Sequence, residues 1–86
     1  MAVQLTQYGM MAEKHWREFR PNMVKEMETK GVLQEMLLDA EEKTANEVYD
    51  LTIQFQKDGL TAQQAYDQAW EIVRERYIFL KPEGTP

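Results

Sequence analysis

The chain has 86 residues, no cysteine and a net charge of −5 at pH 7, and 43% of its residues are hydrophobic. This length allows a single domain with a modest core, and the apolar content is too high for a disordered chain. Without cysteine, disulfides and thiolate-based zinc or redox chemistry are excluded. The N-terminal residues do not resemble a signal peptide, and no apolar run approaches the roughly 20 residues of a membrane span. We therefore expect a cytoplasmic protein that does not enter a membrane.

The negative charge is concentrated in the middle of the chain. Residues 31–60 carry seven acidic and two basic side chains, whereas residues 1–30 carry four acidic and five basic ones. Binding to the phosphate backbone of a nucleic acid requires a basic stripe. Direct binding to nucleic acid is therefore not expected.

The first two predicted elements are helices that meet at Pro21. From residue 6 to residue 20, apolar and aromatic side chains recur at the steps of one helix face. Pro21 removes one backbone donor and disfavours helical geometry at Arg20. Because Met23 and Met27 continue the apolar stripe, we predict a kink or a very tight joint at Pro21. Gly31 suits the left-handed position that ends a helix.

Two longer helices are predicted in the second half. Residues 32–57 show apolar steps of three and four residues, and Gly59 ends the pattern. Thr61 and Gln64 fit a capping box at the start of the last helix. That helix carries a narrow stripe of mostly small side chains, which allows another helix to approach closely: Ala62, Ala65, Ala69, Val73 and Tyr77.

These elements predict an all-α fold, a small bundle of three to four helices joined by short turns. We expect residues 1–81 to form a single helical domain. Residues 82–86 are polar and lack an apolar anchor, so we expect a disordered tail there.

The segment HWREFRP, residues 15–21, contains the only histidine and is the first place to search for a reactive centre. A catalytic histidine needs a nucleophile, an orienting carboxylate or a metal. Glu18 lies three residues after His15, but the chain has neither cysteine nor serine. The segment is therefore predicted to be a helix end, and we expect no catalytic, cofactor-binding or metal-binding residues.

Acidic residues of the third predicted helix do not fit a metal site. A calcium loop needs glycine at its sixth position, and counting from Asp39 that position is Thr44. Helical di-metal sites need Glu-x-x-His pairs, and the only histidine has alanine three residues before it. Glu35, Asp39 and Glu42 instead form one face, which either keeps the helix solvated or docks a basic partner.

Six methionines are a large share of so short a chain. Methionine fills irregular cores, and it also lines adaptable binding grooves. We favour core filling as the role of these methionines. Because a small bundle has few layers to cover wide apolar faces, we expect a homodimer or binding to a protein partner. The candidate interaction surface is Trp16, Met23, Met27, Trp70 and Tyr77.

Several short stretches occur in an order known from one protein family. They are YG at 8–9, His15, REFRP at 17–21, KGVL at 30–33, LDAE at 38–41 and EIVRERYIFL at 71–80. Together they resemble TnpV, a group of small proteins encoded on bacterial mobile elements. The resemblance implies a mobile-element or phage setting. It implies no activity and no functional residues.

The sequence thus predicts a non-enzymatic protein–protein interaction or accessory module that needs no cofactor. The alternative is a small helix-turn-helix-like DNA-binding regulator, because GLTAQQA at 59–65 is typical of the start of a helix in such proteins. The three glutamines at 63, 64 and 68 suit a recognition helix. Asp67 and Glu71 oppose phosphate.

Overall fold

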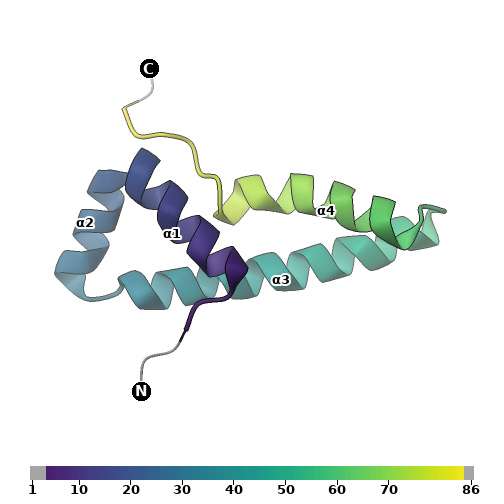
Figure 1. The fold of residues 1–86 in the computed structure, drawn as a ribbon, viewed down its shortest axis with the longest axis horizontal. Coiled ribbons are helices and arrows are strands. Elements are labelled where there is room, and N and C mark those ends of the chain that lie inside the picture. Colours follow the sequence, from purple (N-terminus) through teal and green to yellow (C-terminus); the bar gives the residue numbers. More distant parts are fainter. Residues whose placement is uncertain (1–3, 85–86) are drawn as a thin grey trace.

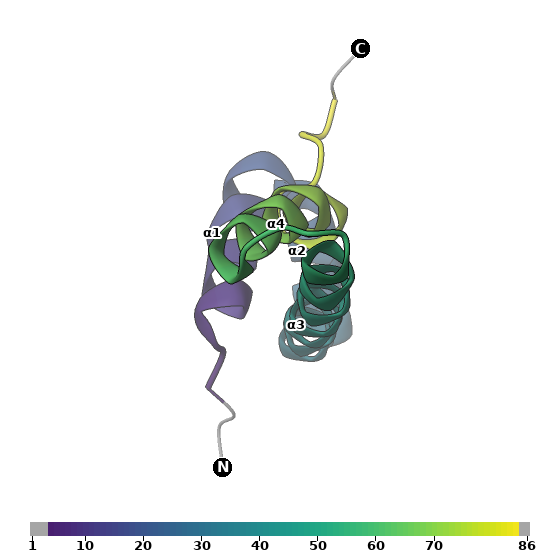
Figure 2. The ribbon, with the colours of Figure 1, turned by 90° about the vertical axis from the view of Figure 1, so that its right-hand side faces the viewer.

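The computed structural model describes residues 4–84, and within this range the chain forms four α-helices and no strand (Figure 1). Helices α1 (Gln7–Phe19) and α2 (Pro21–Lys30) make a corner, and α3 (Leu33–Lys57) and α4 (Ala62–Tyr77) run antiparallel as a long hairpin. Seen along the hairpin, α4 lies above α3, and α1 lies to one side of them (Figure 2). The predicted all-α bundle of helices joined by short turns is confirmed.

A single residue, Arg20, separates α1 from α2. Its backbone has φ −131° and ψ 51°, outside the helical region, as the proline that follows it requires. Pro21 occupies the first position of α2, where a backbone N–H is not needed. The sequence predicts either a kink or a very tight joint at Pro21, and the structure has the joint, where the chain changes direction (Figure 1).

Local signals also set the ends of α2 and the start of α4. Gly31 has φ 71°, and the N–H of Val32 bonds to the carbonyl of Met27 at 2.9 Å, which closes α2 with a Schellman motif. At the other turn, Thr61 Oγ1 accepts from the Gln64 N–H and Gln64 Oε1 accepts from the Thr61 N–H. The predicted capping box is therefore confirmed.

Gly9 lies inside α1, where it allows a close approach to α3. A Cβ atom at this position would lie 2.5 Å from Glu41 Oε2. The same carboxylate oxygen accepts a hydrogen bond from the backbone N–H of Thr6 at 2.7 Å. Glycine thus lets the first turn of α1 rest against an acidic side chain of α3.

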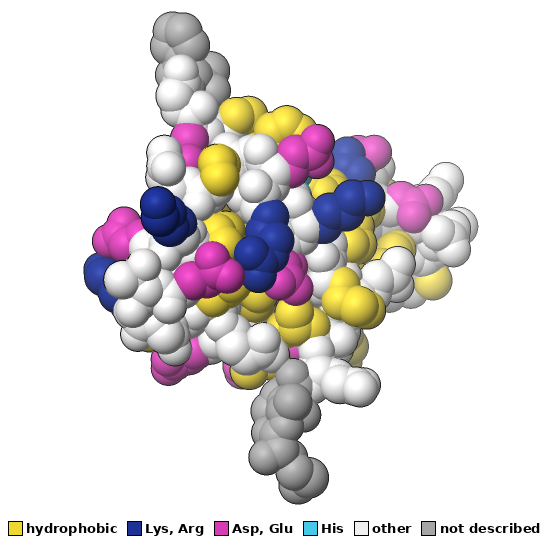
Figure 3. Space-filling view, turned by 60° about the vertical axis from the view of Figure 1, so that its left-hand side comes forward, with side chains coloured by type: hydrophobic (Ala, Val, Ile, Leu, Met, Phe, Trp, Pro, Cys, Tyr) yellow, Lys and Arg dark blue, Asp and Glu magenta, His cyan; other side chains and the backbone are white. Residues whose placement is uncertain are grey.

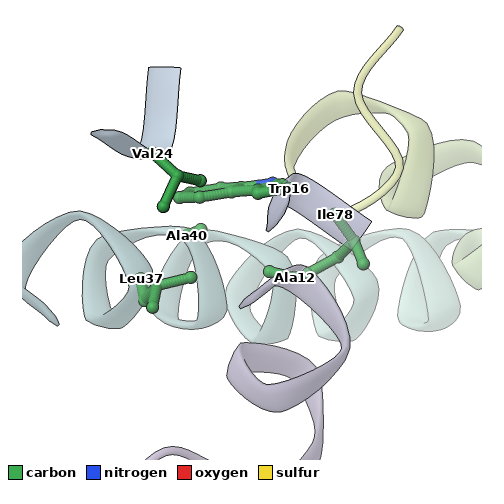
Figure 4. Close-up of a cluster of buried hydrophobic side chains, with 6 residues drawn as sticks. All are labelled: Ala12, Trp16, Val24, Leu37, Ala40 and Ile78. Atoms are coloured by element: carbon green, nitrogen blue, oxygen red, sulfur yellow. The ribbon is translucent and has the colours of Figure 1, made fainter. Parts of the chain in front are cut away.

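The buried side chains form two clusters. The larger one fills the space where α1, α2, α3 and the segment after α4 meet, and the Trp16 indole lies between Val24 and Ala40 (Figure 4). Its members are Ala12, Trp16, Val24, Leu37, Ala40 and Ile78. The smaller cluster, Val48, Ala69 and Val73, lies within the hairpin.

Close packing of α4 on α3 depends on small side chains. Ala65, Ala69 and Val73 are fully buried, whereas Ala62 is exposed in the first turn. Thr44 of α3 is also fully buried, and its hydroxyl donates to the carbonyl of Ala40 at 2.8 Å, so this polar group is satisfied.

Replacing Ala65 by a larger side chain tests this packing. We expect Ala65→Leu to lower the free energy of unfolding by about 1–3 kcal/mol, because the added atoms have no space against α3. The matched variant Ala62→Leu on the same helix should change it by less than about 0.5 kcal/mol. Urea denaturation of both variants measures the difference, and equal stability would contradict the packing.

Candidate interaction surfaces

Side chains of the segment HWREFRP form hydrogen bonds with the backbone of residues 77–81. Residues 78–84, here called the strap, run from the end of α4 back across α1 towards the start of α2 (Figure 1). Three HWREFRP side chains bond to backbone carbonyl oxygens at or just before the strap: Trp16 Nε1 to Tyr77 at 3.2 Å, His15 Nε2 to Leu80 at 2.8 Å, and Arg20 Nη1 to Lys81 at 3.1 Å. His15, Trp16 and Arg20 are thus engaged within the molecule.

His15 has a structural role in this contact. Because a carbonyl oxygen only accepts hydrogen bonds, Nε2 of His15 must carry the proton that it shares with Leu80. The imidazole also packs against Phe19 and Phe79, with ring centroids 4.5 and 5.1 Å apart. The ring thereby fixes the strap on α1.

Glu83 of the strap caps α2. Its Oε1 accepts from the Asn22 N–H at 2.9 Å and its Oε2 from the Met23 N–H at 2.8 Å, while its own N–H donates to the carbonyl of Phe19. These two donors belong to the first turn of α2, where no helical carbonyl can reach them. The negative carboxylate also suits the positive end of the helix dipole.

We expected a disordered tail at residues 82–86, but Glu83 is held in place by its hydrogen bonds to α2. The polar composition of this stretch suggests a tail, but its partner lies some sixty residues earlier in the chain, where no local pattern reveals it. Residues 85–86 lie outside the described residues.

An aromatic row covers the junction of α1 and α4. Tyr8 stacks on Trp70 with ring centroids 5.3 Å apart, and Trp70 and Phe79 meet edge to face with centroids 6.2 Å apart. The hydroxyl groups of Tyr8 and Tyr66 lie 3.1 Å apart. Burial, with a further effect of the Tyr66 hydroxyl, raises the pKa of Tyr8 to about 12.

Tyr77 and Arg76 both bond to Glu47, across the α3–α4 interface. The Tyr77 hydroxyl donates to Oε2 of Glu47, and Arg76 Nη1 donates to Oε1 at 2.8 Å. The Tyr77 hydrogen bond is the main reason that the pKa of Glu47 lies below its usual value. The same hydrogen bond raises the pKa of Tyr77.

The five residues predicted as one interaction surface therefore do not form a single surface in the folded chain. The prediction is wrong for Trp16, which is only 3% exposed, because its indole fills the main core. Trp70 and Tyr77 are half-buried and engaged by Tyr8 and Glu47. A surface built from all five would need their contacts with the rest of the chain to break.

Met23 and Met27 do line a groove. The methionine groove, of about 290 Å³, lies between α2 and the start of α3 and is formed by Met23, Glu26, Met27, Lys30, Val32 and Met36. Figure 3 brings this end of the molecule forward and shows apolar atoms between acidic and basic side chains. Lys30 and Glu26 form an ion pair at 3.0 Å, so the rim of the groove has no dominant charge.

A second groove, which the sequence analysis missed, lies beside the α3–α4 hairpin. The tyrosine groove, of about 270 Å³, is formed by Tyr8, Ala45, Val48, Tyr49, Thr52 and Tyr66. Tyr49 is 66% exposed and Tyr66 is 41% exposed. The sequence contains one pattern that could have indicated this groove. Ala45, Tyr49 and Thr52 are spaced i, i+4 and i+7, which makes a second stripe beside the main apolar face of α3.

The predicted acidic face is exposed on α3. Glu35, Asp39 and Glu42 all reach solvent. Asp39 pairs with Lys43 at 3.1 Å, and this hydrogen bond raises the pKa of Lys43. Glu42 precedes Ala45 by three residues, so the acidic face and the tyrosine groove are neighbours on one helix.

Two negative findings concern the described residues alone. Among residues 4–84, no three His, Asp or Glu side chains are arranged to hold a metal ion. Over the same range, none of the helices has the length and apolar character needed to cross a membrane.

Comparison of the chain with protein-family models, curated proteins and solved structures finds no match. The resemblance to the TnpV group therefore stays a prediction that depends on the stretches quoted above.

Removing the charge of Glu83 tests the cap on α2. We expect Glu83→Gln to lower the free energy of unfolding by about 0.5–2 kcal/mol, the usual effect of losing a helix cap. The amides of Asn22 and Met23 should also exchange faster with solvent in NMR measurements. Glu75→Gln, at an exposed position of α4, is the control. Unchanged exchange at both amides would show that the strap does not cap α2.

The Tyr77 hydrogen bond predicts a response to acid. Because the folded state lowers the pKa of Glu47, this group stabilises the fold above its ordinary pKa of 4.5, and the contribution is lost as pH falls through the folded value. Tyr77→Phe removes the main cause, so the pKa of Glu47 should rise and less stability should be lost to acid. Carboxyl NMR titration measures the pKa, with Tyr49→Phe as control. An unchanged Glu47 pKa in Tyr77→Phe would contradict the assignment.

Proposed function

We propose that this protein is a non-enzymatic interaction module that receives a protein partner on the open side of the α3–α4 hairpin. The tyrosine groove is the observation that carries this proposal, because it places two exposed tyrosines beside an apolar depression. Tyrosine is enriched at protein interfaces, since its ring supplies a large rigid apolar area and its hydroxyl can bond at the edge.

The arrangement of the helices supports this choice of surface. Helices α1 and α2 cover only one end of the hairpin, and beyond them α3 and α4 continue as two helices alone (Figures 1 and 2). Within the hairpin, the buried apolar side chains are Val48 of α3 and the small side chains Ala65, Ala69 and Val73 of α4. A partner helix laid on the hairpin would bury apolar surface that two helices cannot cover.

Self-association is the competing form of the same function. Two hairpins placed face to face would make a four-helix arrangement with the symmetric interface of a dimer. Such a pairing would also bring together two copies of an acidic helix, since residues 31–60 carry seven acidic and two basic side chains. We therefore favour a different protein as the partner over the homodimer expected from the sequence.

The DNA-binding alternative has little support in this arrangement. The glutamines at the start of α4 are exposed, but α4 runs antiparallel to α3 instead of crossing it at the wide angle of a helix-turn-helix. Helix α3 does leave α2 at a wide angle (Figure 1). Its exposed start, however, carries Glu35 and Asp39, which repel phosphate. A mobile-element setting, as in the TnpV group, remains part of the proposal.

Photo-crosslinking from the groove tests the proposal. A chain with Tyr49→p-benzoylphenylalanine should form a covalent adduct with a protein partner in lysate of the native cell. The same substitution at Met10, which is 57% exposed on α1 and outside the groove, should not. An adduct of twice the chain mass would indicate the homodimer. No adduct from position 49 would contradict the proposed function.

A further inference from the structure

The surroundings of the tyrosine groove specify a class of partner. We infer that the groove binds an amphipathic helix of another protein, with an apolar stripe between basic flanks. This inference rests on the proposed function, because it assumes that the open side of the hairpin is the docking surface.

Charge is the first argument. Side chains three or four residues from a groove residue on the same helix lie beside it. Among all such neighbours of the groove residues, the charged ones are Glu41 and Glu42, and none is lysine or arginine. Glu41 is engaged by the Thr6 N–H, whereas Glu42 is exposed. The groove therefore has an acidic border, which favours a cationic occupant and disfavours a nucleic acid.

The acidic border continues along α3. Asp39 and Glu35 lie one and two turns before Glu42, and both are exposed. Lys43 neutralises part of the charge of Asp39, so Glu35 and Glu42 carry most of the negative field of this face. A partner helix that follows α3 would meet carboxylates along its flank, and these would speed its association at low salt.

Shape is the second argument. Ala45, Tyr49 and Thr52 follow α3 for two turns, about 10 Å, and Tyr66 of α4 forms the opposite wall. A helix laid between such walls contacts them with residues spaced i, i+3 or i+4, and i+7. The distance from Glu35 to Thr52 is about 26 Å along the helix, so a partner of about 17 residues would reach both features.

The tyrosine rings add a third argument. Tyr49 and Tyr66 are the exposed aromatic residues of the groove. Lysine and arginine are attracted to the faces of aromatic rings, more strongly when the contact is shielded from water. A basic flank therefore suits the walls of the groove as well as its acidic border. A second copy of this chain suits neither, because it would present another acidic α3.

Two matched peptides test the inference. Both are amphipathic helices of about 17 residues with the same leucine stripe, and one carries lysine and the other glutamate on its flanks. Fluorescence anisotropy with the full chain should show binding of the lysine peptide and an affinity at least about tenfold lower for the glutamate peptide. Added salt should reduce the difference. Chemical shift changes in the unmodified protein should centre on Ala45, Tyr49 and Tyr66.

Matched variants locate the binding. Tyr49→Asp should weaken binding of the lysine peptide about tenfold or more, whereas Met10→Asp should leave it unchanged. Glu42→Gln should weaken it severalfold at low salt, and Glu75→Gln should not. Circular dichroism verifies that each variant is folded. If Tyr49→Asp does not fold, the chemical shifts of the unmodified protein locate the binding site instead.

The outcomes separate the inference from the proposed function. Equal affinity for the two peptides, no binding of the lysine peptide, or shifts centred outside the groove would overturn the inference. The inference would also be overturned if light scattering showed a homodimer that the Tyr49→Asp substitution dissociates, because the groove would then be occupied by a second copy. If one of these results accompanies a photo-crosslinked adduct from position 49, the inference fails and the proposed function stands.

Discussion

Trp16 connects every part of this small fold. Its indole comes from α1, packs between Val24 of α2 and Ala40 of α3, and donates through Nε1 to the carbonyl that ends α4. A tryptophan meets two requirements at once there, because it supplies a large apolar area and a polar N–H that donates to a partly buried carbonyl. The corner of α1 and α2 is thereby fixed on the hairpin, and the strap is brought to the residues that hold it.

The sequence predicts the features that depend on neighbouring residues. The joint at Pro21, the left-handed Gly31 and the capping box of Thr61 follow from steric and hydrogen-bonding rules within a few positions. Contacts between residues that are distant in the chain were not predicted. The carboxylate of Glu83 reaches the start of α2 because of the path that the strap takes, and Trp16 is core instead of surface because α2 and α3 enclose its indole.

The two ends of the molecule have different properties. At the α1–α2 end, hydrogen bonds and aromatic packing close the structure, and the charges of both signs are mixed (Figure 3). Beside the α3–α4 hairpin, the apolar walls of the tyrosine groove stay open and the charged side chains one turn away are acidic. The tyrosine groove escaped the sequence analysis because its residues come from three helices and only Ala45, Tyr49 and Thr52 share a visible spacing.

The strap also has a consequence for the order of folding. The α3–α4 hairpin joins residues that are close in the chain, so its contacts can form early and at little cost in loop-closure entropy. The main core needs Ile78, and the cap on α2 needs Glu83, so both require the strap to have been synthesised. On the ribosome, α1 and α2 must therefore wait for the strap, some fifty residues after α2, before they acquire their native packing.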